Sequence, residues 1–162
     1  MKRNTNRRMI VVDVENVNGG PIASPAQGAW VERILTHRLG LQAGDQVVIG
    51  CNRDGLSLTN LYSAWGTRVR YVAEPGTDGA DCALLQVMTE DLPQRFDELL
   101  LVSGDHIFAP MIAHLATNGL PTHVFAHTES LAPALKLAAT RVSTLRPQEP
   151  HEPGSIEWKE GA

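Results

Sequence analysis

The sequence predicts an α/β protein built on one mainly parallel open sheet. Short apolar runs of strand length alternate along the chain with stretches of helical spacing. Two runs, Met9–Val12 and Leu99–Val102, are continuously apolar, which is typical of parallel strands buried on both faces. Each run ends near an aspartate, Asp13 or Asp105. Because ligands bind at the carboxyl ends of parallel strands, these two aspartates are the first candidates for a functional site.

The remaining elements follow from periodicity and turn residues. Strands are expected at residues 9–12, 46–51, 67–73, 99–102 and 122–126, with a last short strand at 141–145. Helices are expected at residues 26–39, 56–65, 80–89, 108–118 and 131–138. Gly40, Gly66 and Gly119 follow three of these helices, where a helix end favours a residue without a Cβ.

Right-handed crossovers give a three-layer fold with the strand order 3-2-1-4-5 and helices on both faces. Strands 1 and 4 are then neighbours, and their carboxyl ends bring Asp13 and Asp105 to one crevice. Two carboxylates this close tolerate each other best with a cation between them. We expect Mg²⁺ or Mn²⁺, because the sequence lacks the clustered Cys and His that zinc requires.

Composition limits the class of protein. We expect one domain over residues 9–145, a basic flexible arm at residues 1–8 and a disordered acidic, Pro-rich tail at residues 146–162. The arm is either a solvated tail or a contact for phosphates. The net charge of -4 argues against non-specific coating of nucleic acid. Two isolated cysteines, no signal peptide and no membrane-length apolar stretch predict a cytoplasmic protein that does not enter a membrane.

Three ordered motifs resemble the NYN domain family, which consists of PIN-like nucleases. They are Val12-Asp13-Val14-Glu15-Asn16, Gly79-Ala80-Asp81 and Leu101-Val102-Ser103-Gly104-Asp105, and the likeness continues through Phe108-Ala109-Pro110, Gly119 and Val124. It therefore covers about residues 9–145. The resemblance implies a metal-dependent ribonuclease in which Asp13, Asp81 and Asp105 are the catalytic and metal-binding carboxylates and Asn16 is the accompanying polar residue. Taken alone, Asp81 is better explained as a charge at the positive end of a helix dipole.

One position departs from the family pattern. Family members usually carry a second acid two residues after the Asp of the Ser-Gly-Asp motif, and here Ile107 occupies that position, after His106. Glu15, Glu74 and Asp78 are candidates to supply the missing charge, although an ordinary surface role is the favoured interpretation of each.

The expected substrate is single-stranded or looped RNA. Asn16 is a candidate substrate-binding residue, and Arg53, Arg68 and Arg70 are candidate contacts for backbone phosphates. The alternative hypothesis is a catalytically weak or inactive member of the same fold that binds RNA or a protein. A phosphatase with Asp13 as nucleophile fits less well, and a serine hydrolase lacks its Gly-x-Ser-x-Gly motif. The sequence sets no oligomeric state.

Overall fold

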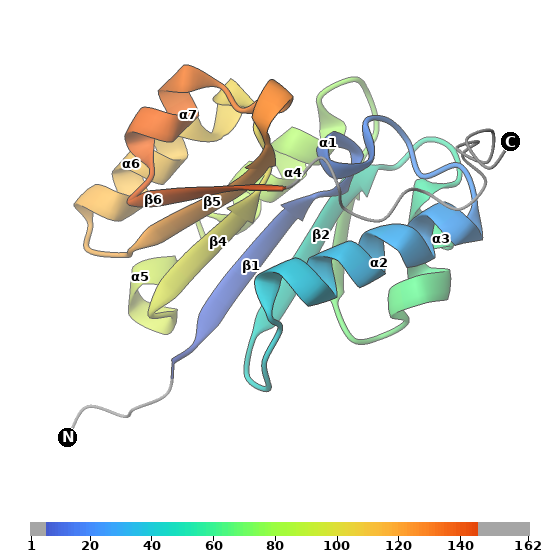
Figure 1. The fold of residues 1–162 in the computed structure, drawn as a ribbon, viewed down its shortest axis with the longest axis horizontal. Helices are drawn as coiled ribbons and strands as arrows, with labels where there is room; N and C mark the ends of the chain where they lie inside the picture. The colour runs from blue at the N-terminus through green and yellow to red at the C-terminus, as the bar shows by residue number, and fades with distance from the viewer. Residues whose placement is uncertain (1–5, 146–162) are drawn as a thin grey trace, which may run out of the picture.

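The computed structural model describes residues 6–145, and the expected tail at residues 146–162 and the first five residues lie outside this range. One parallel six-stranded sheet forms the centre of the molecule (Figure 1), in the order β3-β2-β1-β4-β5-β6. The strands are β1 (Arg8–Asp13), β2 (Gln46–Asn52), β3 (Arg70–Glu74), β4 (Glu98–Val102), β5 (Thr122–His127) and β6 (Arg141–Leu145). The predicted order 3-2-1-4-5 is confirmed, and the last short strand adds a sixth position beside β5.

Helices cover both faces of the sheet, as the prediction of three layers requires. The helices are α1 (Val14–Asn18), α2 (Pro25–Leu39), α3 (Ser57–Trp65), α4 (Gly79–Val87), α5 (Leu92–Arg95), α6 (Ala109–Thr117) and α7 (Pro133–Ala138). Two short 3-10 helices, η1 (His106–Phe108) and η2 (Thr128–Ser130), follow β4 and β5.

The side chains of β1 point alternately to the two faces of the sheet, so they contribute to two separate halves of the core. Ile10 and Val12 pack with residues of α1, α2 and α3, whereas Met9 and Val11 pack with residues of α4, α5, α6 and α7. All four side chains are at most 1% exposed. This explains why the run is continuously apolar, because a central parallel strand has no face left for water.

The structure differs from the expected elements at three places. The α1 helix begins directly after β1, where no helix was expected, because Asp13 caps it and Gly19 ends it with φ 78°. The α5 helix was not expected, since four residues are too few for a periodic signal. The third strand begins at Arg70 rather than at residue 67.

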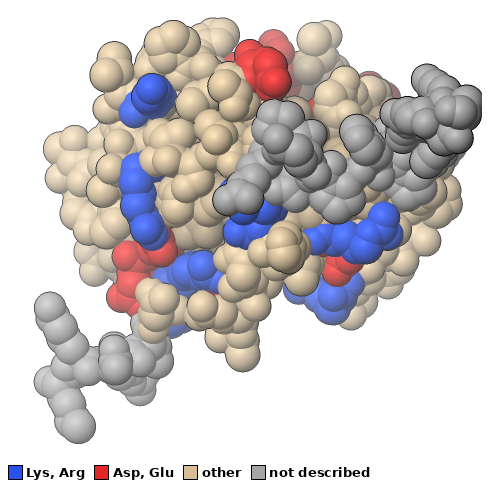
Figure 2. Space-filling view, in the orientation of Figure 1, with Lys and Arg blue, Asp and Glu red and all other residues tan. Residues whose placement is uncertain are grey.

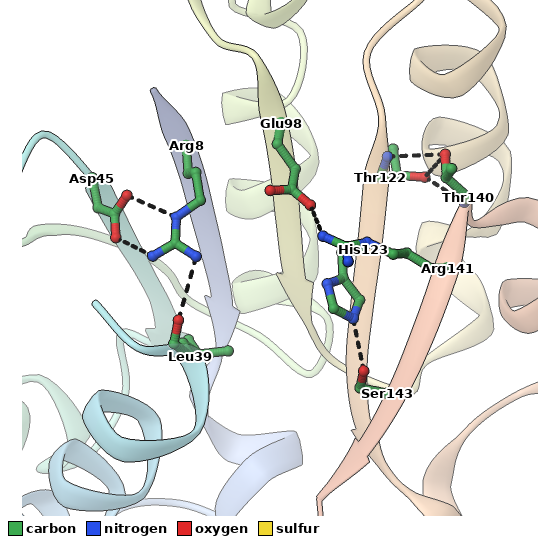
Figure 3. Close-up of polar contacts among 9 residues, drawn as sticks. All are labelled: Arg8, Leu39, Asp45, Glu98, Thr122, His123, Thr140, Arg141 and Ser143. Carbon is green, nitrogen blue, oxygen red and sulfur yellow. Dashed lines mark hydrogen bonds and ion pairs between the residues drawn. The ribbon is translucent and has the colours of Figure 1, made fainter. Parts of the chain in front are cut away.

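Arg8 lies within the range that was expected to form a basic arm, but it is the first residue of β1. Its guanidinium is buried at the amino edge of the sheet and is bound by both carboxylate oxygens of Asp45, with Nε to Oδ1 at 2.9 Å (Figure 3). It also donates to the carbonyl of Leu39 at 3.3 Å. The ion pair stabilises the charge, so the arginine can occupy the sheet rather than solvent.

Further polar contacts join the other strands at the same edge (Figure 3). Arg141 of β6 forms an ion pair with Glu98 of β4 at 2.6 Å, and the His123 ring on β5 lies 2.8 Å from the Ser143 hydroxyl on β6. These contacts fasten β6 to the sheet. None of the helices in residues 6–145 is long and apolar enough to cross a bilayer.

The Arg8–Asp45 pair yields a stability prediction. Asp45→Asn should lower the free energy of unfolding by about 3 kcal/mol, because it leaves the buried guanidinium without its counter-charge. Glu90→Gln, which breaks the exposed Arg70–Glu90 pair, is the control and should cost at most about 1 kcal/mol. Urea denaturation of the two variants measures the free energy of unfolding. Equal losses would show that the buried ion pair stabilises the fold no more than the exposed one.

Candidate active site

The neighbouring strands β1 and β4 position the first two carboxylates. Their parallel register pairs Val12 with Val102, so the residues that follow each strand emerge side by side at the carboxyl edge. Asp13 ends β1, and Asp105 caps η1 just after β4. The strand order also reverses at this point of the sheet, which makes the crevice between the two ends a topological switch point.

A single hydroxyl joins the two aspartates. Ser103 Oγ donates to Asp13 Oδ2 at 2.8 Å and accepts the Asp105 backbone N–H at 3.2 Å. Ser103 is 1% exposed, so its side chain is enclosed between the strands. The hydroxyl therefore links the end of β1 to the turn after β4.

Asp13 is buried and carries the more constrained carboxylate. It is 5% exposed, and its Oδ1 also accepts the backbone N–H of Asn16 at 3.5 Å. Burial raises the pKa of Asp13 to about 6, opposed by the hydrogen bonds from Ser103 and Asn16, while the charges of Asp105 and Glu15 raise it further. The protein thus bears a cost for keeping this group ionised at neutral pH.

Asp105 is more accessible than Asp13. Its Oδ1 accepts the backbone N–H of Ile107 at 3.0 Å, which caps η1. The Nδ1 atom of His106 lies 3.2 Å from the same oxygen, but its side chain is 83% exposed. His106 therefore lies at the rim of the crevice.

Asp81 reaches the same crevice from the first turn of α4, which packs against β2 and β3. Burial raises the pKa of Asp81 to about 6, and the charges of Asp13 and Asp105 contribute next, followed by Asp78 and Glu15. The three predicted carboxylates are therefore within electrostatic range of one another. A role as a helix-dipole partner alone would not explain why the charges of two other aspartates act on Asp81.

Two glycines make this convergence sterically possible. A Cβ on Gly79 would lie 2.1 Å from the carbonyl oxygen of Glu74, so only glycine lets α4 start this close to the end of β3. A Cβ on Gly104 would lie 2.2 Å from the carbonyl oxygen of Ser130, so the segment after β5 closes over the Ser-Gly-Asp turn. Both positions belong to the motifs that carried the sequence prediction.

Asn16 lies at the site in a supporting position. Its Oδ1 accepts the backbone N–H of Gly104 at 3.1 Å, which ties α1 to the end of β4. This bond positions the two strand ends relative to each other, and it uses one acceptor position of a side chain that was expected to bind substrate.

The candidates for the missing acid differ in position. Glu15 is half-buried and accepts the backbone N–H of Asn52 at 3.0 Å, and its charge acts on both Asp13 and Asp81. The charge of Asp78 acts on Asp81. Glu74 ends β3 and is exposed. Glu15 is therefore the acid that the structure adds to the three aspartates, through a contact between α1 and β2 that the sequence alone does not show.

The predicted arginines do not gather at this edge. Arg53 follows β2 at the carboxyl edge, next to the site. Arg70 begins β3 and binds Glu90 through both terminal nitrogens at 2.9 Å, and Arg68 precedes it and donates to carbonyls of α3. Arg68 and Arg70 thus lie at the amino edge, away from the carboxylates, so of the three predicted phosphate contacts only Arg53 lies near the site. Parallel strands separate residues at their two ends by the strand length.

Comparison with known proteins identifies the family. The NYN domain model matches residues 54–146, which is more than half of the chain and includes Asp81 and Asp105. The chain belongs to the NYN domain family. The match begins after β1, so Asp13 joins the site through the fold rather than through the matched segment.

A solved structure shares the fold of this NYN domain. A protein of unknown function from Vibrio parahaemolyticus superposes with a TM-score of 0.62 at 16% sequence identity, covering 91% of this chain and 98% of that one. Among curated proteins, the search found no match.

The donor set of the NYN domain suits a hard divalent cation. Asp13, Asp81 and Asp105 offer only oxygen, and Mg²⁺ binds through one or two carboxylates while keeping several of its waters. Within residues 6–145, however, no three His, Cys, Asp or Glu side chains are close enough together to form a ready-made metal cage. The carboxylates therefore match a cation chemically without enclosing one in this conformation.

Ile107 adds no oxygen ligand to this set. It is half-buried and packs against the core on the α4 side of the sheet. An apolar contact thus occupies the position where the sequence comparison with the family led us to expect an acid.

The raised pKa of Asp81 predicts how stability depends on pH. The folded state holds a proton that the unfolded state releases between the ordinary pKa of Asp and about 6. In chelator, the stability of the protein should therefore fall as the pH rises through this window. Asp81→Asn should raise the melting temperature by a few degrees at neutral pH and by much less below pH 4, as scanning calorimetry would show.

The control for this prediction is Glu129→Gln, because Glu129 is exposed in η2 and is absent from the charges that act on the three aspartates. It should leave the melting temperature unchanged. A lower melting temperature for Asp81→Asn at neutral pH would contradict the electrostatic account.

Proposed function

We propose that this NYN domain hydrolyses phosphodiester bonds in RNA, with Mg²⁺ or Mn²⁺ held by Asp13, Asp81 and Asp105. The observation that carries the proposal is the convergence of these three carboxylates from β1, α4 and η1, where burial and mutual repulsion raise the pKa of Asp13 and Asp81 to about 6. Such a concentration of negative charge costs stability, and perturbed carboxylates at a switch point are typical of catalytic sites.

The cation would neutralise charge on the phosphate and supply a water that ionises readily. The chain's own residues would orient the carboxylates and accept a proton from the attacking water. Ser103 donates a 2.8 Å hydrogen bond to Asp13 Oδ2, which orients the Asp13 carboxylate. Asp81 is partly exposed, and its raised pKa makes it a better proton acceptor for an attacking water than an ordinary Asp.

The surroundings favour a single strand over a duplex. The site lies among loops at one edge of the sheet, where an exposed phosphate can approach, and Arg53 is the candidate cation at that edge. Figure 2 shows further Lys and Arg side chains spread over the face on which α2 lies, with an acidic patch at the upper edge. A strand that reaches the carboxylates would then be held by charge on this neighbouring face.

The competing proposal is a domain that binds RNA or a protein without cleaving it. Its specific support is Ile107, which packs against the core in place of an acid. A site with fewer carboxylates attracts a hard cation less strongly.

A cleavage assay separates the two proposals. With labelled single-stranded RNA and Mn²⁺ or Mg²⁺, the native chain should cleave weakly, with Mn²⁺ preferred, and Asp105→Asn should abolish cleavage. Glu129→Gln should cleave like the native chain. RNA binding with no cleavage under any of these conditions favours the binding domain, whereas cleavage that survives Asp105→Asn and chelator contradicts the proposed site.

A gain-of-function variant addresses the departure from the family pattern. Ile107→Asp should tighten Mn²⁺ binding and raise the cleavage rate, because an added carboxylate strengthens the attraction for a hard cation. Ile107→Asn is the matched control, since it loses the same apolar contact without adding charge. Calorimetric titration with Mn²⁺ and the cleavage assay measure both effects, and equal behaviour of the two variants would show that position 107 does not reach the cation.

A further inference from the structure

We propose that two copies of this chain associate by pairing their β3 strands antiparallel, about a two-fold axis at Val72. The strand lies at one end of the sheet, next to β2 alone. Its three central residues, Tyr71, Val72 and Ala73, are half-buried rather than covered. An uncovered edge strand presents backbone donors and acceptors that can pair with another strand.

The backbone of β3 determines which groups face outward. The carbonyl of Glu74 accepts the N–H of Arg53 from the end of β2 at 3.0 Å, so Glu74 directs its peptide groups toward β2. Peptide groups alternate along a strand, so Arg70 and Val72 also direct theirs inward. The outward N–H and carbonyl groups are therefore those of Tyr71 and Ala73.

Antiparallel pairing centred on Val72 satisfies these outward groups. In that register, Tyr71 of one copy lies opposite Ala73 of the other, and the two residues exchange both N–H···O bonds. The two-fold axis repeats this exchange, so all four outward N–H groups and carbonyls are paired. A register shifted by one residue would place outward groups opposite inward ones, which form no bonds.

The side chains are self-complementary in the same register. Arg70 of each copy lies opposite Glu74 of the other, at a position where the peptide groups point away and side chains approach closely. Two ion pairs thus flank the contact between the Val72 side chains on one face of the extended sheet. Arg70 is half-exposed in its pair with Glu90, so it can meet a second carboxylate.

The flanking surfaces have the character of an interface. On the face of Tyr71, its ring lies 6.0 Å from that of Tyr62, which is 54% exposed, and Leu58 lies one turn earlier on α3. On the opposite face, Arg70, Val72 and the exposed Gln86 line a groove of about 360 Å³ between β3 and α4. Aromatic and apolar side chains beside an unpaired edge favour a protein contact over solvent.

The opposite edge strand lacks this pattern. In β6, Arg141 is the single charged residue and already binds Glu98 of β4 at 2.6 Å. Pairing β6 with its own copy would therefore place no acid opposite the arginine. The charges select β3 as the edge that matches itself.

Charge-swap variants test the proposal without relying on a single mutant. Sedimentation velocity over a concentration series should show a monomer–dimer equilibrium for the native chain. Arg70→Glu and Glu74→Arg should each be monomeric, because each places like charges opposite one another twice. Mixing the two variants should restore a dimer, since the heterodimer contains both ion pairs again.

Two more variants control for folding and location. Ala73→Pro removes an outward N–H while leaving the inward bonds of β3, so it should fold, as circular dichroism would show, and remain monomeric. Arg141→Glu on β6 should dimerise like the native chain. The proposal is overturned by a native chain that stays monomeric, by single charge variants that still dimerise, or by a mixture that remains monomeric.

Discussion

The hydroxyl of Ser103 is the interaction on which the site depends. It donates to Asp13 and accepts the backbone N–H of Asp105, so it joins the ends of two strands that are 90 residues apart in the sequence. Both strands are central and buried, which leaves them no freedom to shift along one another. The paired strands β1 and β4 therefore determine the positions of the Asp13 and Asp105 carboxylates.

Charged side chains are paired with opposite charges at the amino edge of the sheet, whereas negative charges accumulate at the carboxyl edge. At the amino edge, Arg8 and Arg141 each meet an acid, so buried or half-buried charges are compensated. At the carboxyl edge, the carboxylates of Asp13, Asp81 and Asp105 influence one another, and among the described side chains only His106 lies within ion-pair distance of any of them. This imbalance lowers stability, and proteins maintain such costs mainly where the charge has a function. Ile107 lies two residues after Asp105, and as an apolar side chain it adds no negative charge to the crevice.

The fold and the candidate site differ in how far the sequence predicts them. The apolar runs of β1 and β4 and the glycines after helices are local signals, and from these the strand order could be predicted before any coordinates. The short helices α1 and α5 were missed because each has too few residues for a periodic pattern. Arg68 and Arg70 were expected to contact the phosphates of the substrate, but they lie at the amino end of β3, away from the carboxylates. Proximity in sequence to a strand does not by itself bring a residue to the site.

The sequence by itself determined the layered architecture and pointed to Asp13 and Asp105, because buried parallel strands and their ends have a recognisable residue pattern. Asp81 lies in the first turn of a helix and was singled out by the resemblance to the NYN domain family. Only the tertiary structure decided which groups surround those aspartates. Glu15 joins them, Asn16 is committed to Gly104, and Arg8 is a sheet residue rather than part of an arm. Each of these depends on contacts between segments distant along the chain, and such contacts leave no periodic trace in the sequence.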